Sequence, residues 1–215
     1  MEFEACIFDL DGTLFDSMGV WVDIDIEFLG KRGIAFTEEY GKAISSMRLS
    51  EAADYTIKRF RLEERAEDII EEWLEMSREK FAHEIGLKPF AKEFLSELRK
   101  KGVPMGIATT SRKELYQPAL ERNGIADYFD VVVDSDMVRT GKESPDIYLK
   151  AAELLEVKPE ECIVFEDTAV GIRSAASCGF MTVGMLDKEN AENHEEIAAA
   201  CDVTAYDFKQ FLIDI

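Results

Sequence analysis

Short apolar runs alternate with helix-like stretches along most of this chain, and this alternation limits the possible folds more than any other feature. The runs are Ala5–Phe8, Met105–Ala108, Val131–Val133, Cys162–Phe165 and Met181–Val183, with Val203–Ala205 as a further candidate. Strands that alternate with helices indicate βαβ units, and short, continuously apolar strands are typical of a parallel sheet covered on both faces. We therefore predict an α/β fold with a central parallel sheet.

Local signals place the helices between these strands. Pro89 and Pro145 suit the first position of a helix, and Ser144 would cap the second of these two. Phe90 would then lie on the apolar stripe of the first helix. Thr168 should cap a third helix, directly after the Cys162–Phe165 run.

The stretch between the first run and the regular α/β part has a different character. Helical stripes recur at three- and four-residue steps, with no convincing strand between Phe15 and His83. The first stripe consists of Met18, Trp21, Ile24 and Phe28. We expect an all-helical insertion over residues 15–84, and an α/β core formed by residues 1–14 and 85–215. The acidic face of the helical insertion is expected to be solvated.

The acidic balance of the chain argues against two classes of partner. Forty-five acidic residues against 25 basic ones give a formal net charge of −20, which would repel a nucleic-acid backbone or an anionic membrane. No apolar run approaches the roughly 18 residues of a membrane span, and the N-terminus lacks a basic region followed by an apolar stretch. We expect a cytoplasmic monomer with no nucleic-acid or membrane partner.

Cysteine and histidine offer little chemistry here. The four cysteines lack a C-x-x-C spacing, and Cys6 and Cys162 lie within apolar runs, as buried free thiols do. With only two histidines, His83 and His194, a histidine-based metal site or triad is disfavoured.

Two carboxylates, Asp9 and Asp11, stand where the first apolar run ends, directly before Gly12. Side chains at i and i+2 of a strand share a face, and two close carboxylates repel unless a proton or a cation lies between them. Oxygen ligands of this kind suit Mg²⁺, and one aspartate could be a nucleophile with the other as general acid/base. Taken alone, the string is equally compatible with a turn; an EF-hand loop is excluded, because the glycine comes too early.

Polar groups also follow other predicted strands or lie in a loop near them. They are Thr109, Thr110 and Ser111 after one strand, Glu166 and Asp167 after another, and Lys142 in a loop. Each has a simpler reading by itself: a helix cap, a charge at a helix start or a surface lysine. The carboxyl ends of parallel strands meet at one edge, however. Together the groups supply a nucleophile, an anion-binding helix start, a cation and metal ligands, as phosphoryl transfer requires.

These motifs, in this order and spacing, resemble the haloacid-dehalogenase-like (HAD) phosphohydrolase superfamily, in the branch related to β-phosphoglucomutase and phosphoglycolate phosphatase. The carriers are the D-x-D-G-T string from Asp9 to Thr13, Thr109 after its strand, Lys142 before Ser-Pro-Asp, and Glu166-Asp167 with Gly171-Ile172 following. The match covers the whole chain. It implies a Rossmann-like, three-layer core with a small helical cap domain inserted after the first strand.

The resemblance also implies a Mg²⁺-dependent mechanism. Asp9 would attack phosphorus to form an aspartyl-phosphate, while Asp11 would protonate the leaving alcohol and then activate water. The metal would be held by the Asp9 side chain, the Asp11 carbonyl and Asp167, with Glu166 nearby. The residues implied to bind the phosphoryl group are Thr109 and Lys142, and the lysine would also steady the nucleophile.

Departures from the family pattern bear on the activity. Trp21 stands where mutase-like members carry a histidine, and Leu49 takes the place of their cap arginine, with Arg48 one position away. The motif Lys142-Glu143-Ser144-Pro145 keeps the lysine but lacks the first proline of Lys-Pro-x-Pro. The second aspartate favours a phosphatase over a dehalogenase.

Three functions remain in competition. The first is a phosphatase of a small phosphomonoester, the second is a β-phosphoglucomutase-like mutase, and the third is a binding protein that keeps the fold without turnover. The intact acidic set disfavours the third. Substrate choice is expected to depend on the cap, where the candidates to face the site are Met18, Trp21, Met47 and Arg48. For Met18 and Trp21, a place in the ordinary core of the cap is an equally good alternative.

Overall fold

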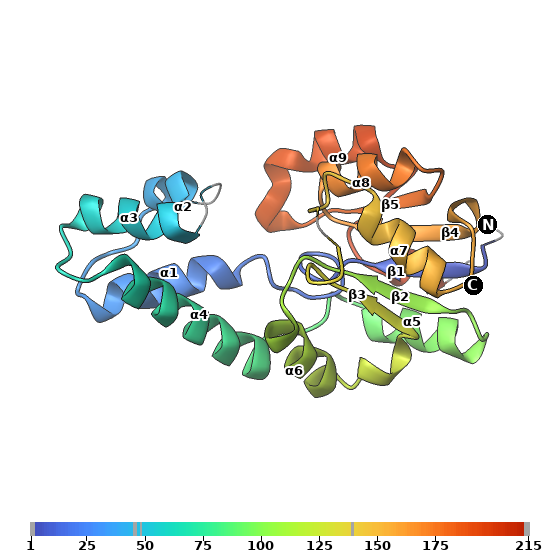
Figure 1. Ribbon diagram of the computed structural model, residues 1–215, viewed down its shortest axis with the longest axis horizontal. Helices are drawn as coiled ribbons and strands as arrows, with labels where there is room; N and C mark the ends of the chain where they lie inside the picture. Colours follow the sequence, from blue (N-terminus) through green and yellow to red (C-terminus); the bar gives the residue numbers. More distant parts are fainter. Residues whose placement is uncertain (1–2, 45–46, 48, 139, 213–215) are drawn as a thin grey trace. The chain divides into compact units, whose positions relative to one another are not determined.

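The computed structural model describes residues 3–44, 47, 49–138 and 140–212, and the chain divides into two compact units (Figure 1). The core unit comprises residues 1–18 and 85–215, and the helical unit comprises residues 19–84. The chain therefore leaves the core unit once and returns to it once.

Among the described residues, six parallel strands form one sheet in the order β3-β2-β1-β4-β5-β6. The strands are β1 (Ala5–Phe8), β2 (Met105–Ala108), β3 (Val131–Val133), β4 (Cys162–Glu166), β5 (Met181–Met185) and β6 (Val203–Ala205). The prediction of an α/β fold with a central parallel sheet is confirmed, and β4 and β5 run past their predicted ends. Because β1 lies between β2 and β4, the polar groups that follow these three strands come to one edge.

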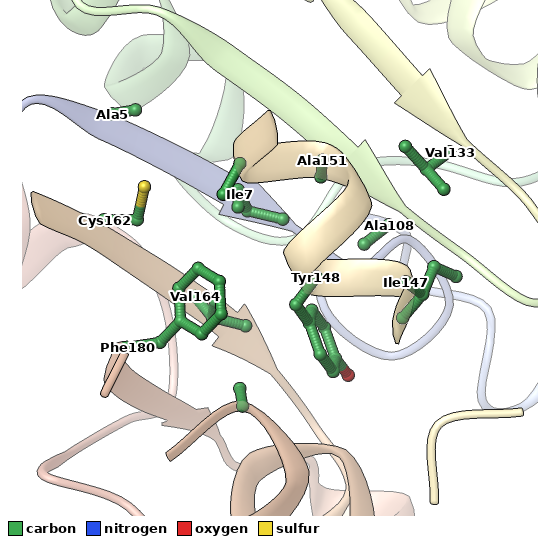
Figure 2. Close-up of a cluster of buried hydrophobic side chains, with 12 residues drawn as sticks. Ala5, Ile7, Ala108, Val133, Ile147, Tyr148, Ala151, Cys162, Val164 and Phe180 are labelled. Atoms are coloured by element: carbon green, nitrogen blue, oxygen red, sulfur yellow. The ribbon is translucent and has the colours of Figure 1, made fainter. Parts of the chain in front are cut away.

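Helices cover the sheet on both faces. They are α5 (Ala91–Lys100), α6 (Lys113–Asn123), α7 (Asp146–Leu154), α8 (Ala169–Ala176) and α9 (His194–Ala200). On one face, Ile147, Tyr148 and Ala151 of α7 pack on Ile7 and Val164 (Figure 2). This double coverage explains why the strands are apolar without alternation.

The opposite face is packed by aromatic rings. Phe8 of β1 stacks on Phe165 of β4 with ring centroids 4.8 Å apart. Phe94 of α5 meets Phe165 edge-on at 5.5 Å and stacks on Phe208 at 5.4 Å. Ring pairs of these geometries contribute more stabilising free energy than the buried area alone would give. These contacts therefore stabilise the central strands, whose carboxyl ends carry the polar groups.

The helical unit contains α1 (Val20–Lys31), α2 (Glu38–Ile44), α3 (Leu49–Phe60) and α4 (Ala66–His83). Phe28 of α1 packs on Trp73 of α4 with centroids 5.2 Å apart. The hydroxyl groups of Tyr40 and Thr56 lie 2.8 Å apart in its interior. Arg32 lies over the Phe28 ring and donates to Glu72 at 2.6 Å. The unit thus has a core of its own.

Two segments of the core unit run side by side next to the point of insertion. Asp16 N donates to Gly86 O at 3.0 Å, and Lys88 N donates to Leu14 O at 2.8 Å. Phe15 and Leu87 form an antiparallel bridge between these two hydrogen bonds. We call residues 14–16 and 86–88 the paired linkers.

Several predicted helix details are wrong. Phe90 is not on a helical stripe, because it adopts a left-handed conformation (φ 64°) that keeps Pro89 and Phe90 outside α5. Pro145 lies just before α7 rather than at its first position, and Ser144 does not cap that helix. The cap at Thr168 is confirmed: its hydroxyl oxygen accepts from Gly171 N at 3.2 Å.

The buried side of α1 also differs from the predicted stripe. Ile24 and Phe28 are buried as expected, but Trp21 is 44% exposed and Met18 precedes the helix. Cys6 and Cys162 are buried free thiols, as predicted. In the part of the chain that the structure describes, no helix combines the length and the apolar character needed to cross a membrane.

Candidate active site

Asp9 follows β1 directly and is fixed by the neighbouring strand. Its backbone N–H donates to Phe165 O at 3.0 Å, which continues the β1–β4 ladder by one step. The side chain of Asp9 is 2% exposed, and Glu166 and Asp167 at the end of β4 are 0% and 4% exposed. Parallel pairing therefore brings three buried carboxylates together from two segments that are far apart in sequence.

The three carboxylates are close enough to share one ion. One oxygen each from Asp9, Glu166 and Asp167 lies within 4.8 Å of the others. Gly12 allows this approach. Its φ of +75° favours glycine, and a Cβ at this position would collide with the Asp167 carboxylate. The glycine of the D-x-D-G string is thus required by the position of the third acid.

Lys142 provides the cation of the site. Its ammonium contacts Oδ1 of Asp9 and lies 2.7 Å from Oε2 of Glu166. Its side chain is 13% exposed, so this charge is largely withdrawn from water. The lysine bridges the carboxylates that follow β1 and end β4.

Glu166 is saturated with hydrogen bonds. Oε1 accepts from the Thr168 amide at 3.0 Å and from its hydroxyl at 2.7 Å. Oε2 accepts from Tyr148 Oη at 2.8 Å as well as from Lys142. The carboxylate is therefore held in one orientation from four directions.

Burial and mutual repulsion set the electrostatics of the group. Burial raises the pKa of Asp9 to about 7; Lys142 opposes this rise, and Glu166 and Asp11 add to it. Burial, Glu166 and Asp9 raise the pKa of Asp167 well above its usual range. Burial would also raise the pKa of Glu166, but Lys142 and the hydrogen bonds lower it overall. Glu166 is therefore the carboxylate that stays ionised, whereas burial and the neighbouring carboxylates disfavour the charged forms of Asp9 and Asp167.

This donor set fits a hard divalent cation. Carboxylate oxygens are the ligands that Mg²⁺ prefers, and a dication would relieve the repulsion that raises the pKa values of Asp9 and Asp167. Asp9 and Asp167 are the best candidates as ligands, since the Glu166 oxygens already accept four hydrogen bonds.

Asp11 occupies a separate position at the same edge. Its Oδ1 accepts from Ser17 Oγ at 2.8 Å, and its Oδ2 accepts from Ser111 Oγ. Its carboxylate does not belong to the group of three acids that could share an ion among the described residues. Two carboxylates two residues apart are thus directed to different partners, which suits different roles.

The segment after β2 brings further polar groups to this edge. Thr109 is 1% exposed, and its hydroxyl oxygen accepts from Ser111 N at 3.0 Å. Thr110 is exposed. Of the two predicted cap residues, Trp21 lies on α1 of the helical unit, and Arg48 lies outside the described residues.

Two residues with a part in this network were not predicted from the sequence. Ser17 donates to Asp11, and the Tyr148 hydroxyl donates to Glu166. Nothing in the sequence pattern marks Ser17. Tyr148 left a signal that could have been used: it lies next to Ile147 and three residues before Ala151 on the buried side of a helix, and a buried phenol needs a partner.

The sequence pattern of the haloacid dehalogenase-like hydrolases matches residues 3–179 of this chain. The chain belongs to this family. The resemblance inferred from the motifs is thereby confirmed, together with the fold that it implied. The acidic strand-end residues of this HAD-like chain all lie within the matched region.

Two relatives of this HAD-like chain are named as phosphatases. A phosphorylated carbohydrates phosphatase of Thermotoga maritima is 29% identical over 176 residues, which cover 82% of each chain. Hexitol phosphatase A of Escherichia coli is 30% identical over 186 residues, which cover 83% of this chain and 81% of the relative. The prediction of an HAD-like phosphatase agrees with both.

A solved structure of similar fold covers the whole length. It is a protein of Thermotoga maritima provisionally named a β-phosphoglucomutase, with a TM-score of 0.88, 26% identity, and 99% of each chain covered. The six-stranded core and the helical insertion of this HAD-like chain therefore recur together.

Proposed function

We propose that this HAD-like chain is a Mg²⁺-dependent phosphatase that hydrolyses small phosphomonoesters through an aspartyl-phosphate. The observation that supports it best is the pairing of Asp9 with Lys142 beside Asp167, all largely withdrawn from water. Such an arrangement combines a nucleophile, a fixed cation and a metal ligand at one point. Preorganised charges in a dry site stabilise the charge that develops during phosphoryl transfer.

The residues have distinct tasks in the two half-reactions. In the first, an Asp9 oxygen forms a bond to phosphorus, the bond from phosphorus to the ester oxygen breaks, and Asp11 gives its proton to the leaving alkoxide. In the second, Asp11 takes a proton from water, whose oxygen attacks phosphorus and releases inorganic phosphate and free Asp9. Lys142 stays in contact with Asp9 and neutralises charge on the phosphoryl oxygens.

Mg²⁺ would be held by Asp9 and Asp167, with a main-chain oxygen of Asp11 as an implied third ligand. When bound, the ion supplies positive charge that neutralises the phosphoryl group and the crowded carboxylates. Thr109 would bind the phosphoryl group through its buried hydroxyl, and the Thr110 amide would add a donor shortly before α6, whereas the Ser111 amide already donates to Thr109.

A sugar or polyol phosphate is the proposed substrate class. The support is the names of two relatives, a phosphorylated carbohydrates phosphatase and a hexitol phosphatase. The helical unit, with Trp21 and Arg48, would act as the cap that selects the organic part of the ester. Cap domains of this kind admit substrate and exclude water.

Phosphate release from a panel of sugar, polyol and aryl phosphates tests the proposal. We expect turnover with Mg²⁺, none after chelation with EDTA, and none in Asp9→Asn, whose amide cannot act as the nucleophile. Arg173→Gln is a matched surface control, since its guanidinium pairs only with exposed Glu196 among the described contacts. Full activity in Asp9→Asn would exclude the aspartyl-phosphate route.

A β-phosphoglucomutase-like activity is the second candidate, because the similar solved structure carries that provisional name. Trp21 in place of the histidine of mutase-like members disfavours it. An isomerisation assay with β-glucose 1-phosphate and a bisphosphate activator separates the two. Isomerisation faster than phosphate release would favour the mutase.

A further inference from the structure

Tyr148 is a fully buried phenol with a partner in the site. It lies on α7 among the apolar side chains that cover β1 and β4, and its ring ends in the hydroxyl oxygen seen in Figure 2. The residue is 0% exposed, and its Oη lies 2.8 Å from Oε2 of Glu166. The tyrosine therefore connects the core to the carboxylate that fixes Lys142.

The structure leaves space for this hydroxyl by means of a glycine. A Cβ at Gly171, in the first turn of α8, would lie 2.6 Å from Tyr148 Oη and 2.7 Å from Glu166 Cδ. Any larger residue at this position would displace the Tyr148 hydroxyl, the Glu166 carboxylate or both. The contact is thus built by three elements: α7 brings the phenol, β4 brings the carboxylate, and α8 leaves the gap.

The hydroxyl shares its acceptor with the catalytic cation. Oε2 of Glu166 accepts from both Tyr148 and Lys142, while the same ammonium also contacts Asp9. A hydrogen bond from the phenol satisfies part of the Glu166 charge, which reduces its pull on Lys142. Without the phenol, the ammonium would be drawn toward Glu166 and away from Asp9.

We propose that Tyr148 is a positioning residue, which acts through Glu166 to hold Lys142 against Asp9 and the transferring phosphoryl group. This proposal rests on the proposed phosphatase function. Partners that orient a charged group at a reaction site typically contribute about 10- to 100-fold to activity. Loss of the Tyr148 hydroxyl should raise the free energy of the transition state more than that of bound substrate, because the interaction of Lys142 with the phosphoryl oxygens is strongest there.

Tyr148→Phe removes only the hydroxyl and keeps the ring in the core. We expect kcat to fall about 10- to 100-fold and KM to change less than about threefold. Tyr116→Phe is the matched control: that side chain is also buried and donates at 2.9 Å to a carboxylate, Asp134, which lies outside the catalytic set. It should lose a similar amount of thermal stability and keep its kcat.

A double-mutant cycle with Glu166→Gln separates positioning from a general structural role. If Tyr148 acts through Glu166, Tyr148→Phe should cost less than about twofold in the Glu166→Gln background. Gly171→Ala disturbs the same contact from α8, since its methyl group would lie 2.6 Å from Tyr148 Oη and 2.7 Å from Glu166 Cδ. It should lower kcat in the same direction, which keeps the test decisive if Tyr148→Phe fails to fold.

The same double-mutant cycle can be measured without turnover, from the Kd of orthovanadate in the presence of Mg²⁺, determined by calorimetry. This Kd should rise in Tyr148→Phe by a factor similar to the loss in kcat, and not in Tyr116→Phe. If the wild-type chain hydrolyses no ester, the proposed function fails, and the vanadate cycle still decides the role of Tyr148. A kcat and vanadate affinity within about twofold of wild type in Tyr148→Phe, or equal losses in both backgrounds, would overturn the proposal.

Discussion

The hydroxyl of Ser111 donates a hydrogen bond to Oδ2 of Asp11, although the two residues are 100 positions apart in the chain. The parallel order of β1 and β2 makes this possible, because both residues follow their strands at the same edge. Ser17 donates to the other oxygen of the same carboxylate at 2.8 Å. Two hydroxyl groups thus set the orientation of the proposed acid/base.

Ser111→Ala should slow turnover without unfolding the protein. Loss of one of the two donors lets the Asp11 carboxylate rotate, and we expect kcat/KM to fall about tenfold. The double variant Ser17→Ala/Ser111→Ala should be slower still. Steady-state kinetics with one phosphate ester measures both. Ser96→Ala is the control, since its hydroxyl pairs with Tyr128 on another part of the core unit; an equal loss in that variant would contradict this role.

Asp167→Asn should stabilise the metal-free protein and abolish its response to Mg²⁺. Burial, Glu166 and Asp9 raise the pKa of Asp167 above the ordinary 3.8. The folded state therefore holds a proton that the unfolded chain releases, so this carboxyl makes metal-free stability fall as the pH rises above about 4. At pH 7.5 we expect the amide to raise the Tm of the metal-free protein.

Thermal unfolding with and without millimolar Mg²⁺ makes the comparison. The wild-type protein should gain stability with Mg²⁺ by mass action, whereas Asp167→Asn should not. Asp134→Asn, an acid outside the three-carboxylate group, serves as the control and should keep the Mg²⁺ response. An undiminished Mg²⁺ shift in Asp167→Asn would mean that Asp167 is not a ligand.

Lys88→Met should destabilise the core unit strongly. The ammonium pairs with Asp187 and lies 3.5 Å from Asp16, and the Lys88 and Asp187 side chains are 7% and 3% exposed. Removing one partner of a buried ion pair leaves the other charge buried without that counter-charge, and costs about 3–5 kcal/mol. The double variant Lys88→Met/Asp187→Asn should recover at least half of this loss, because both charges of the pair are then removed.

Urea unfolding gives the free energies for this comparison. Lys100→Met is the control, since Lys100 pairs with Glu97 on the surface, with side chains 70% and 41% exposed. That change should stay within about 0.5 kcal/mol of wild type. If Lys88→Met costs no more than Lys100→Met, the buried pair does not stabilise the paired linkers.

Asp25→Asn should stabilise the helical unit at alkaline pH. Burial raises the pKa of Asp25 to about 7, so its ionisation opposes folding as the pH rises from about 4 to 7. After allowance for its partial exposure, we expect a gain of about 1 kcal/mol at pH 8 and a smaller gain at pH 5. Hydrogen exchange of the helical unit at both values measures it. Asp54→Asn, an exposed change on α3, should show no such pH-dependent gain.

The central strands β1, β2 and β4 could be predicted because they are buried on both faces. Strands such as Ala5–Phe8 and Met105–Ala108 are apolar throughout because they are buried throughout. Their first and last residues could therefore be predicted from the apolar runs in the sequence alone. Phe90 shows the limit of this reasoning. Its spacing fits a helical stripe, but one left-handed backbone conformation places it outside α5, and spacing does not encode that conformation.

The proposed catalytic set was predictable for a similar reason. Asp9 and Asp167 follow strands, and parallel pairing brings strand ends together whatever the intervening sequence. The contacts that orient Asp11 and Glu166 were not predictable. The bond from Ser17 to Asp11 depends on the path of a turn, and that from Tyr148 to Glu166 depends on how closely α7 approaches β4.

The paired linkers hold the two ends of the helical insertion next to each other at the core unit. Because Asp16 and Gly86 are hydrogen-bonded to each other, the chain leaves and rejoins the core at one place. We therefore expect β1 and Asp9 to stay in place when a segment of another length or shape is grafted there. Exchange of this one segment would therefore leave the proposed nucleophile on an unchanged strand.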